Sequence, residues 1–201
     1  MKIIIGINTY HADSSACIIV DGNLIAAIEE ERINRKKHYS GYPIESIKEC
    51  LRIAEKKELE ITDIAFNTKP SSNLFFKGTF FMKNFSFKKN SLLKRFKNKI
   101  NIKKLLLEEF TLNNNVKFHY IEHHLAHIAS AFYPSGFRDA VGLSIDGSGD
   151  FVTLAISECK NNKIKIIEKT NFPNSLGIFY HAMTQFLGFK NYGDEYKVMG
   201  L

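Results

Sequence analysis

Residues 3–27 read IIIGINTYHADSSACIIVDGNLIAA and set the architecture of the N-terminal half of the chain. A short apolar run opens this segment, polar residues 8–15 follow, and two strand-like runs flank Asp21-Gly22. Asp-Gly between two apolar runs is typical of a β-hairpin. The segment therefore predicts three consecutive strands, of which the second and third are joined by a tight turn.

Helical and strand-like patterns alternate after this hairpin. The exception is residues 70–90, which are rich in Phe and are expected to be irregular. The expected elements are a helix from Pro43 to about residue 57, a strand at 61–66, a basic helix at 92–110, a strand at 116–121 and a helix beginning at Glu122.

The resulting order, β-β-β-α-β-α-β-α, is that of a ribonuclease-H-like lobe of the α/β class. Strands that alternate with helices predict a mostly parallel sheet, with the opening hairpin at one edge. We assign residues 1–137 to this first lobe and treat about 69–115 as a variable basic insert.

The element order then begins again. Two lobes of this kind form the actin-like ATPase (ASKHA) architecture, in which the turn after each lobe's first strand meets nucleotide phosphates. Residues 138–201 hold only the start of the second lobe, so we expect the chain to be the N-terminal part of a longer protein. The expected elements are strands at 140–145, 152–157 and 163–168, a tight polar loop at 146–150, a helix at 174–187 and another helix from Asp194.

The composition is that of a globular protein, with 44% hydrophobic and 24% charged residues among 201. No apolar run is long enough to span a bilayer, and the N-terminus lacks a signal-peptide pattern. The three cysteines are far apart and form no C-x-x-C motif. These features favour a reducing, cytoplasmic location.

The net charge of +7 comes from one segment. Residues 77–104 contain nine Lys and one Arg but no Asp or Glu, and the rest of the chain has 18 basic and 21 acidic residues. Such a patch with interleaved Phe can bind nucleic acid or an anionic surface. A solvated lysine-rich helix is the simpler interpretation, and we do not expect nucleic acid as a partner.

Three histidines lie within five residues in the segment EHHLAHIASAF, residues 122–132. Its apolar residues recur at helical spacing, and His123 and His127 are four residues apart. The two imidazoles therefore share one helix face and can hold a divalent metal if a third ligand comes from elsewhere. Spacing alone leaves ordinary surface or core histidines as an alternative.

Two loops have a composition that suits nucleotide phosphates. In the expected loop Asp146-Gly147-Ser148-Gly149-Asp150, glycine N–H groups can approach phosphate oxygens, and the two aspartates can hold hydrated Mg²⁺ or a ribose hydroxyl. In the corresponding loop of the first lobe, His11 can act as an acid or a base. An ordinary solvent turn is the alternative for both loops.

The C-terminal segment contains two acidic residues and a lysine after a glycine. Asp194 and Glu195 can accept hydrogen bonds from ribose hydroxyls, and Lys197 can support them. Acidic residues also favour the first turn of a helix, so an ordinary helix start explains the same pattern.

Taken together, these motifs resemble the N-terminal region of the O-carbamoyltransferases, a family with nodulation and antibiotic-tailoring members. The motifs are GINTYHADSSACIIVDG, EEERINRKKH, HHLAHIASAFYPSGF, DGSGD, SLGIFYHAMTQFLGF and GDEYKVMGL, in this order. The resemblance covers the chain except about 69–115. One departure is His11-Ala12-Asp13, where many relatives carry His-Asp-Ala, and it leaves the role of Asp13 open.

The resemblance implies an enzyme that uses carbamoyl phosphate and ATP to form carbamoyl adenylate. The carbamoyl group then passes to a hydroxyl of a small-molecule or saccharide acceptor. An activating domain and a third, carboxylate metal ligand would come from sequence outside this chain. The resemblance also implies that His123 and His127 bind an iron(II)-type metal, that His11 lies near the carbamoyl group, and that Asp146, Gly147, Gly149, Asp194, Glu195 and Lys197 face the adenylate, with Ser148, Asp150 and Gly193 beside them.

Two other functions remain open from the sequence. The same superfold hosts sugar kinases and related phosphotransferases, although phosphoryl transfer does not need a metal bound by imidazoles. A binding module without catalysis could use the Lys77–Lys104 patch on an anionic surface. The sequence also leaves the hydroxyl acceptor and a homodimeric state open.

Overall fold

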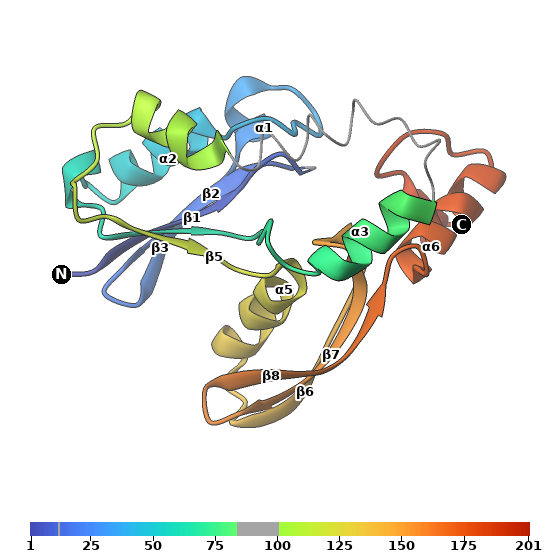
Figure 1. Cartoon of the computed structure of the whole chain (residues 1–201). Coiled ribbons are helices and arrows are strands. Elements are labelled where there is room, and N and C mark those ends of the chain that lie inside the picture. Colours follow the sequence, from blue (N-terminus) through green and yellow to red (C-terminus); the bar gives the residue numbers. More distant parts are fainter. Residues whose placement is uncertain (12, 84–100) are drawn as a thin grey trace. The chain divides into compact units, whose positions relative to one another are not determined.

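The computed structural model describes residues 1–11, 13–83 and 101–201 (Figure 1). The chain forms two compact units. Unit 1 comprises Met1–Pro70 and Asn84–Ile121, and unit 2 comprises Ser71–Lys83 and Glu122–Leu201. Within the described ranges, no helix has both the length and the apolar character needed to cross a membrane.

Unit 1 is built on a five-stranded sheet with the order β3-β2-β1-β4-β5. Strand β1 pairs antiparallel with β2 and parallel with β4, and β4 pairs parallel with β5. This topology confirms the ribonuclease-H-like lobe with its hairpin at one edge. The strands are β1 (Ile3–Asn8), β2 (Ser15–Val20), β3 (Asn23–Glu29), β4 (Asp63–Phe66) and β5 (Lys117–Tyr120).

The sheet is mixed rather than mostly parallel, because its first three strands are joined by short connections. Strands joined by a short turn must run antiparallel. At the β2–β3 turn, Asp21 and Gly22 have φ angles of 46° and 87°, both positive as a type I′ turn requires. The Asp21 carboxylate also accepts the backbone N–H of Lys2 at 2.6 Å. The hairpin predicted from Asp-Gly is therefore confirmed.

The core of unit 1 lies between the sheet and its helices (Figure 1). Every second residue of β1 is buried, and α2 (Ile44–Ile53) and the helical residues 101–109 supply the opposing apolar side chains. The predicted basic helix at 92–110 is confirmed for this described part, and its first residues lie outside the described ranges. The fully buried side chains of the sheet and of these helices include Ile3, Ile5, Ile18, Ile47, Ile64 and Ile102.

A buried carboxylate joins the two helices that follow the hairpin. Glu30 opens α1 (Glu30–Asn34), and its side-chain oxygens accept the backbone N–H groups of Glu45 at 3.3 Å and Ser46 at 2.8 Å. These N–H groups belong to the first turn of α2, where no intrahelical acceptor exists. Glu30, which lies in α1, therefore provides the hydrogen-bond acceptor that the first N–H groups of α2 lack. A short 3₁₀ helix, Glu58–Glu60, precedes β4.

Unit 2 contains an antiparallel sheet with the order β6-β7-β8. Helix α5 packs on one face of this sheet, where Ile128 and Phe132 meet Ala155 and Cys159 (Figure 1). The unit contains β6 (Asp139–Gly149), β7 (Val152–Lys160), β8 (Lys163–Asn171), α3 (Leu74–Lys83), α5 (His123–Phe132), the 3₁₀ helix Tyr133–Ser135, α6 (Leu176–Phe186) and α7 (Glu195–Val198).

Helix α5 groups with unit 2, whereas the sequence placed it in a first lobe ending at residue 137. The reason is that its apolar face is buried against the sheet of unit 2. Segment Ser71–Lys83 also belongs to unit 2. The expected start of a second lobe, with three strands and a helix, is confirmed.

The expected polar loop 146–150 is a strand end instead. Strand β6 extends to Gly149. Its pairing with β7 becomes irregular after Ile145 and returns where Gly149 pairs with Val152. The turn consists of Asp150 and Phe151, with φ angles of 49° and 73°. Asp and Gly favour turns in a sequence, but here Gly149 pairs with Val152 of β7 and the turn itself begins only at Asp150.

Part of the segment expected to be irregular is helical. Helix α3 packs Phe80 edge-on against Phe151 and Phe172, with ring centroids 5.4 and 5.2 Å apart. Asn73, just before the helix, donates its side-chain amide to the Asp150 carbonyl at 2.9 Å. These contacts are distant in sequence, so the local composition did not reveal the helix.

Candidate metal centre

The first turn of α5 places two imidazoles together. The Glu122 side chain accepts the Leu125 N–H at 3.0 Å, so it caps the helix directly before His123. His123 and His127 are then one turn apart, with Nε2 atoms separated by 3.0 Å. The predicted shared helix face is therefore confirmed.

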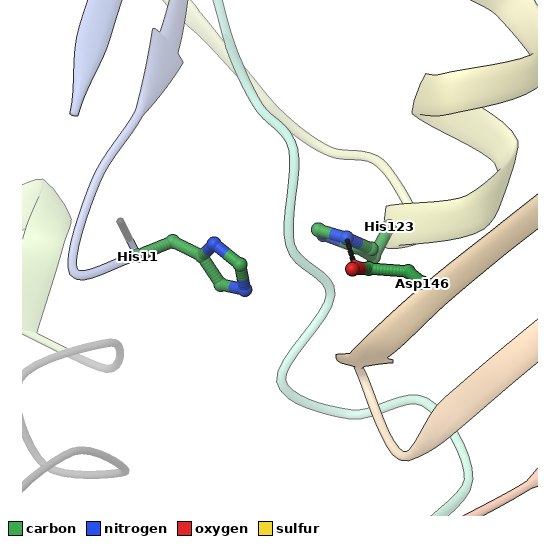
Figure 2. Close-up of side chains that lie close together, drawn as sticks. All are labelled: His11, His123 and Asp146. Atoms are coloured by element: carbon green, nitrogen blue, oxygen red, sulfur yellow. Dashed lines mark hydrogen bonds and ion pairs between the residues drawn. The ribbon is translucent and has the colours of Figure 1, made fainter. Parts of the chain in front are cut away.

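A carboxylate from the end of β6 completes this group. Asp146 Oδ2 lies 2.8 Å from His123 Nε2 and 3.9 Å from His127 Nε2. Figure 2 shows the Asp146 carboxylate facing the His123 ring. All three residues belong to unit 2. We call His123, His127 and Asp146 the triad. The family resemblance implies a carboxylate ligand outside this chain and Asp146 at the adenylate, whereas here Asp146 supplies the carboxylate beside the two imidazoles.

The distances in the triad fit a single metal ion. Ligand atoms bound about 2.0–2.2 Å from one metal lie about 2.8–3.6 Å apart at octahedral or tetrahedral angles. Two of the three separations lie in this range, and the His127–Asp146 separation exceeds it by a few tenths of an ångström. Two imidazoles and one carboxylate are also the ligand set typical of non-haem iron(II).

Proton positions give a second argument for a cation. His123 Nε2 lies within hydrogen-bond distance of both His127 Nε2 and Asp146 Oδ2. If this nitrogen carries a proton, the carboxylate and the lone pair of an unprotonated His127 Nε2 must share that single proton. If it is unprotonated, its lone pair faces a carboxylate. A cation that accepts a lone pair from each of the three atoms removes this conflict.

Asp146 is held in its charged form. A hydrogen bond from His123 and a weaker one from His127 lower the pKa of this carboxyl well below its usual range, although burial opposes the shift. The Gly147 N–H donates to Oδ1 at 2.6 Å. An anionic oxygen is therefore available to a cation throughout the physiological pH range.

His124, between the two candidate ligands, has a structural role. It is fully buried, and its Nε2 donates to the Val152 carbonyl at 2.9 Å while Nδ1 accepts from the Ser144 hydroxyl at 2.8 Å. Burial lowers the pKa of His124, so the ring is neutral. Because these contacts join α5 to β6 and β7, His124 keeps the helix in register with Asp146.

Two close contacts with the end of β6 and its turn also hold His123 in place. The Asp150 carboxylate accepts the His123 backbone N–H at 3.1 Å. A Cβ atom on Gly149 would overlap the His123 ring. Asp150 and Gly149, expected at a nucleotide site, therefore support His123 in this structure.

Helix α6 begins against the same segment. The Ser175 hydroxyl donates to the carbonyls of Asp146 at 3.1 Å and Gly147 at 2.8 Å and accepts the Ile178 N–H. A Cβ on Gly177 would lie 2.6 Å from the Gly147 nitrogen. Neither Ser175 nor Gly177 is among the site residues predicted from the sequence, although a serine directly before a helical pattern is a cap signal that marks this helix start.

The C-terminal residues expected at the adenylate lie beside the middle of α6, where Glu195 contacts Tyr180 and His181. Asp194 pairs with Lys197 at 2.6 Å and accepts the Asn191 N–H at 3.0 Å, and the contact with Lys197 lowers the Asp194 pKa. Glu195 pairs with His181 of α6 at 2.7 Å. The predicted start of a helix near Asp194 is confirmed by α7, after Gly193 with φ of 82°.

His11 belongs to unit 1, between β1 and β2. Its carbonyl accepts the Ser14 hydroxyl at 3.3 Å. The role expected for its imidazole stays a prediction.

The sequence of this chain is similar to part of two longer proteins. It is 34% identical to an uncharacterised protein of Synechocystis over 100% of this chain and 34% of that protein. It is also 34% identical to the nodulation protein NolNO of Sinorhizobium fredii, over 96% of this chain and 28% of that protein. The chain thus spans about a third of the length of these relatives.

Solved structures with a similar arrangement have low sequence identity. YeaZ from Pseudomonas aeruginosa gives a TM-score of 0.48 at 12% identity, over 86% of this chain and 68% of YeaZ. The ethanolamine utilization protein EutJ from Carboxydothermus hydrogenoformans gives 0.49 at 11% identity, over 98% of this chain and 61% of EutJ.

One family accounts for nearly every residue of the sequence. The family described as "Carbamoyltransferase N-terminus" matches residues 3–201. This match agrees with the ordered motifs of the sequence, so the chain belongs to the carbamoyltransferase N-terminus family.

Proposed function

We propose that this chain is the N-terminal part of an enzyme that transfers a carbamoyl group to a hydroxyl of a small-molecule or saccharide acceptor. In this proposal, carbamoyl phosphate and ATP provide the group as carbamoyl adenylate. Family membership and the similarity to a nodulation protein support the reaction class. The single structural observation that carries the proposal is the triad.

The triad would hold a divalent metal, with iron(II) as the ion that suits its ligand set best. Such an ion supplies Lewis-acid chemistry, which polarises a carbonyl or lowers the pKa of a bound hydroxyl. The chain's own contribution is to present three donor atoms within 4 Å of one another and to keep Asp146 anionic. Asp146 is thus better suited to the metal than to the adenylate contact expected from the sequence.

Helix α6 supports the second part of the proposal, a nucleotide site. It contacts the Asp146-Gly147 backbone at its start and α7 through His181. We propose that Gly147 and Ser148 on one side and Gly193, Asp194, Glu195 and Lys197 on the other bind the adenylate. Backbone N–H groups and the Lys197 ammonium would offset the charge of the departing AMP. Mg²⁺ bound to the nucleotide phosphates is compatible with this arrangement.

His11 would serve as the acid or base for the acceptor hydroxyl. An imidazole changes its charge near neutral pH, so it can accept the hydroxyl proton as the oxygen attacks the carbamoyl carbon. This role rests on the resemblance of the sequence.

Metal analysis tests the triad directly. The purified chain is equilibrated anaerobically with Fe²⁺, and bound iron is measured for the wild type, His123→Ala and Asp146→Asn. We expect each substitution to remove one equivalent of iron, because each removes one of three donors. The control is His119→Gln, which breaks an Asp–His pair of unit 1. Iron binding that is the same in all four proteins would exclude the triad as a metal site.

Titration with AMP tests the nucleotide site. Lys197→Ala should weaken AMP binding about 10–150-fold, since a charged hydrogen bond contributes about 1.5–3 kcal/mol. Lys190→Ala, another lysine of the same segment, is the matched control. Equal AMP affinity in both variants would contradict the placement of Lys197.

A further inference from the structure

A second group of metal-ligand side chains lies in unit 1, apart from the triad. Asp13, Glu31 and His38 each offer a ligand atom, and these atoms lie within 4.8 Å of one another. His38 Nδ1 is 3.1 Å from Asp13 Oδ1, a separation that suits two donors on one metal. Within the described part of unit 1, Asp13 Oδ2 makes no hydrogen bond and remains available.

These three donors come from separate segments that the backbone holds together. Asp13 precedes β2, Glu31 lies in α1, and His38 follows that helix. The His38 N–H donates to Glu31 Oε2 at 2.8 Å, which brings the imidazole and this carboxylate together. The Ser14 N–H donates to the Tyr39 carbonyl at 2.9 Å, so residues next to two of the donors are also bonded.

The backbone conformation of two donors is unusual. Asp13 and His38 have φ angles of 60° and 54°, in the left-handed region that few residues other than glycine adopt. Such conformations are concentrated at ligand clamps and active sites, where the surrounding contacts impose them. Here the imposed conformations direct both side chains toward the same point.

Exposure and charge also suit a cation. The Asp13, Glu31 and His38 side chains are 44%, 16% and 34% exposed, so an ion can enter from solvent and complete its coordination with water. Two carboxylates contribute two negative charges, and Arg32 Nη1 lies 3.8 Å from Glu31 Oε1, whereas Glu31 Oε2 is the oxygen that accepts the His38 N–H. An imidazole with carboxylates is a ligand set for Mn²⁺, Zn²⁺ or Fe²⁺ rather than for Ca²⁺.

We propose that Asp13, Glu31 and His38 form a second divalent-cation site, which takes Mn²⁺ or Zn²⁺ and ties the segment carrying His11 to the segment after α1. Asp13 is two residues from His11, so the bound ion restrains the loop in which the candidate acid or base lies. The site depends neither on the triad nor on the proposed reaction. Its occupation is therefore measurable without turnover.

The test is a count of bound ions in the full chain equilibrated with Mn²⁺ alone. The wild type should bind two equivalents. Asp13→Asn and His38→Gln should each lose one, or bind it at least about tenfold more weakly, and keep the equivalent that His123→Ala removes. Asn tolerates the left-handed backbone at position 13, so Asp13→Asn is a mild change.

The matched control is His119→Gln. His119 and Asp63 form another Asp–His pair of unit 1, with Nε2 and Oδ1 2.6 Å apart, and neither belongs to the group of three donors. This variant should keep both equivalents. If Asp13→Asn and His38→Gln also keep both, the second site does not exist, whatever the triad binds.

A measurement on the unaltered protein covers the case of variants that fail to fold. Mn²⁺ broadens NMR signals of nuclei close to it, so the His38 imidazole signals should disappear at saturating Mn²⁺. If His38 signals remain sharp, the proposal is wrong.

Discussion

Gly149 lies directly against the imidazole ring of His123, where a methyl group would overlap the ring. This contact joins the end of β6 to the first turn of α5. The only residue that fits there has no side chain, so the position of the His123 ring depends on Gly149. The neighbouring Gly147 differs, because a Cβ there would meet no atom within 4 Å.

Gly149→Ala should therefore displace His123 and loosen the triad. We expect metal affinity to fall about 10–100-fold, as for other changes in residues that orient a ligand. Overpacking should also lower the free energy of unfolding of unit 2 by about 1–3 kcal/mol. Gly147→Ala is the control for both measurements, metal titration and hydrogen exchange. If the two variants have equal metal affinity, the contact with Gly149 does not position His123.

His124 gives unit 2 a specific dependence on pH. Burial lowers its pKa from an ordinary value of about 6.5, whereas in the unfolded chain the ring titrates normally. Below about pH 6.5 the unfolded state therefore binds more protons than the folded state, and stability falls with decreasing pH until the folded pKa is reached.

This dependence can be measured with His124→Gln. The variant loses the titration but also part of the hydrogen bonding to Ser144 and Val152, so at pH 7.5 it should be about 1–3 kcal/mol less stable. Between pH 7.5 and 5.0, wild-type stability should decrease more steeply than that of the variant. Hydrogen exchange of β7 amides in EDTA provides the measurement, since EDTA keeps metal binding out of the comparison. Parallel pH profiles would show that His124 does not titrate on unfolding.

The elements that the sequence predicted well have local signals. Asp21-Gly22 specifies a turn with two positive φ angles, and Glu122 provides a helix cap three residues before the N–H that it accepts. The spacing of His123 and His127 follows from the helix period alone. These features need no knowledge of the rest of the chain.

The third donor of the triad could not be predicted in this way. The direction of the Asp146 carboxylate depends on the irregular pairing of β6 with β7 between Ile145 and Gly149, and on the packing of α5 across that sheet. Helix α3 was missed for a similar reason, because its stability depends on Phe80 contacts with Phe151 and Phe172. Tertiary contacts of this kind leave little trace in local composition.

Ser175 links the triad to the proposed nucleotide site, because its hydroxyl contacts the Asp146 and Gly147 carbonyls and also caps α6. Ser175→Ala removes all three hydrogen bonds and should destabilise the start of α6 by about 1 kcal/mol, the usual cost of losing a cap. Since Asp146 is held by the same contacts, the variant should also bind metal several-fold more weakly. Ser130→Ala, which alters an exposed hydroxyl bonded to the His127 carbonyl within its own helix, is the control. Hydrogen exchange of α6 amides measures the loss of the cap, and a metal titration measures the effect on the triad. If Ser175→Ala weakens the cap but leaves metal affinity unchanged, the start of α6 does not position Asp146.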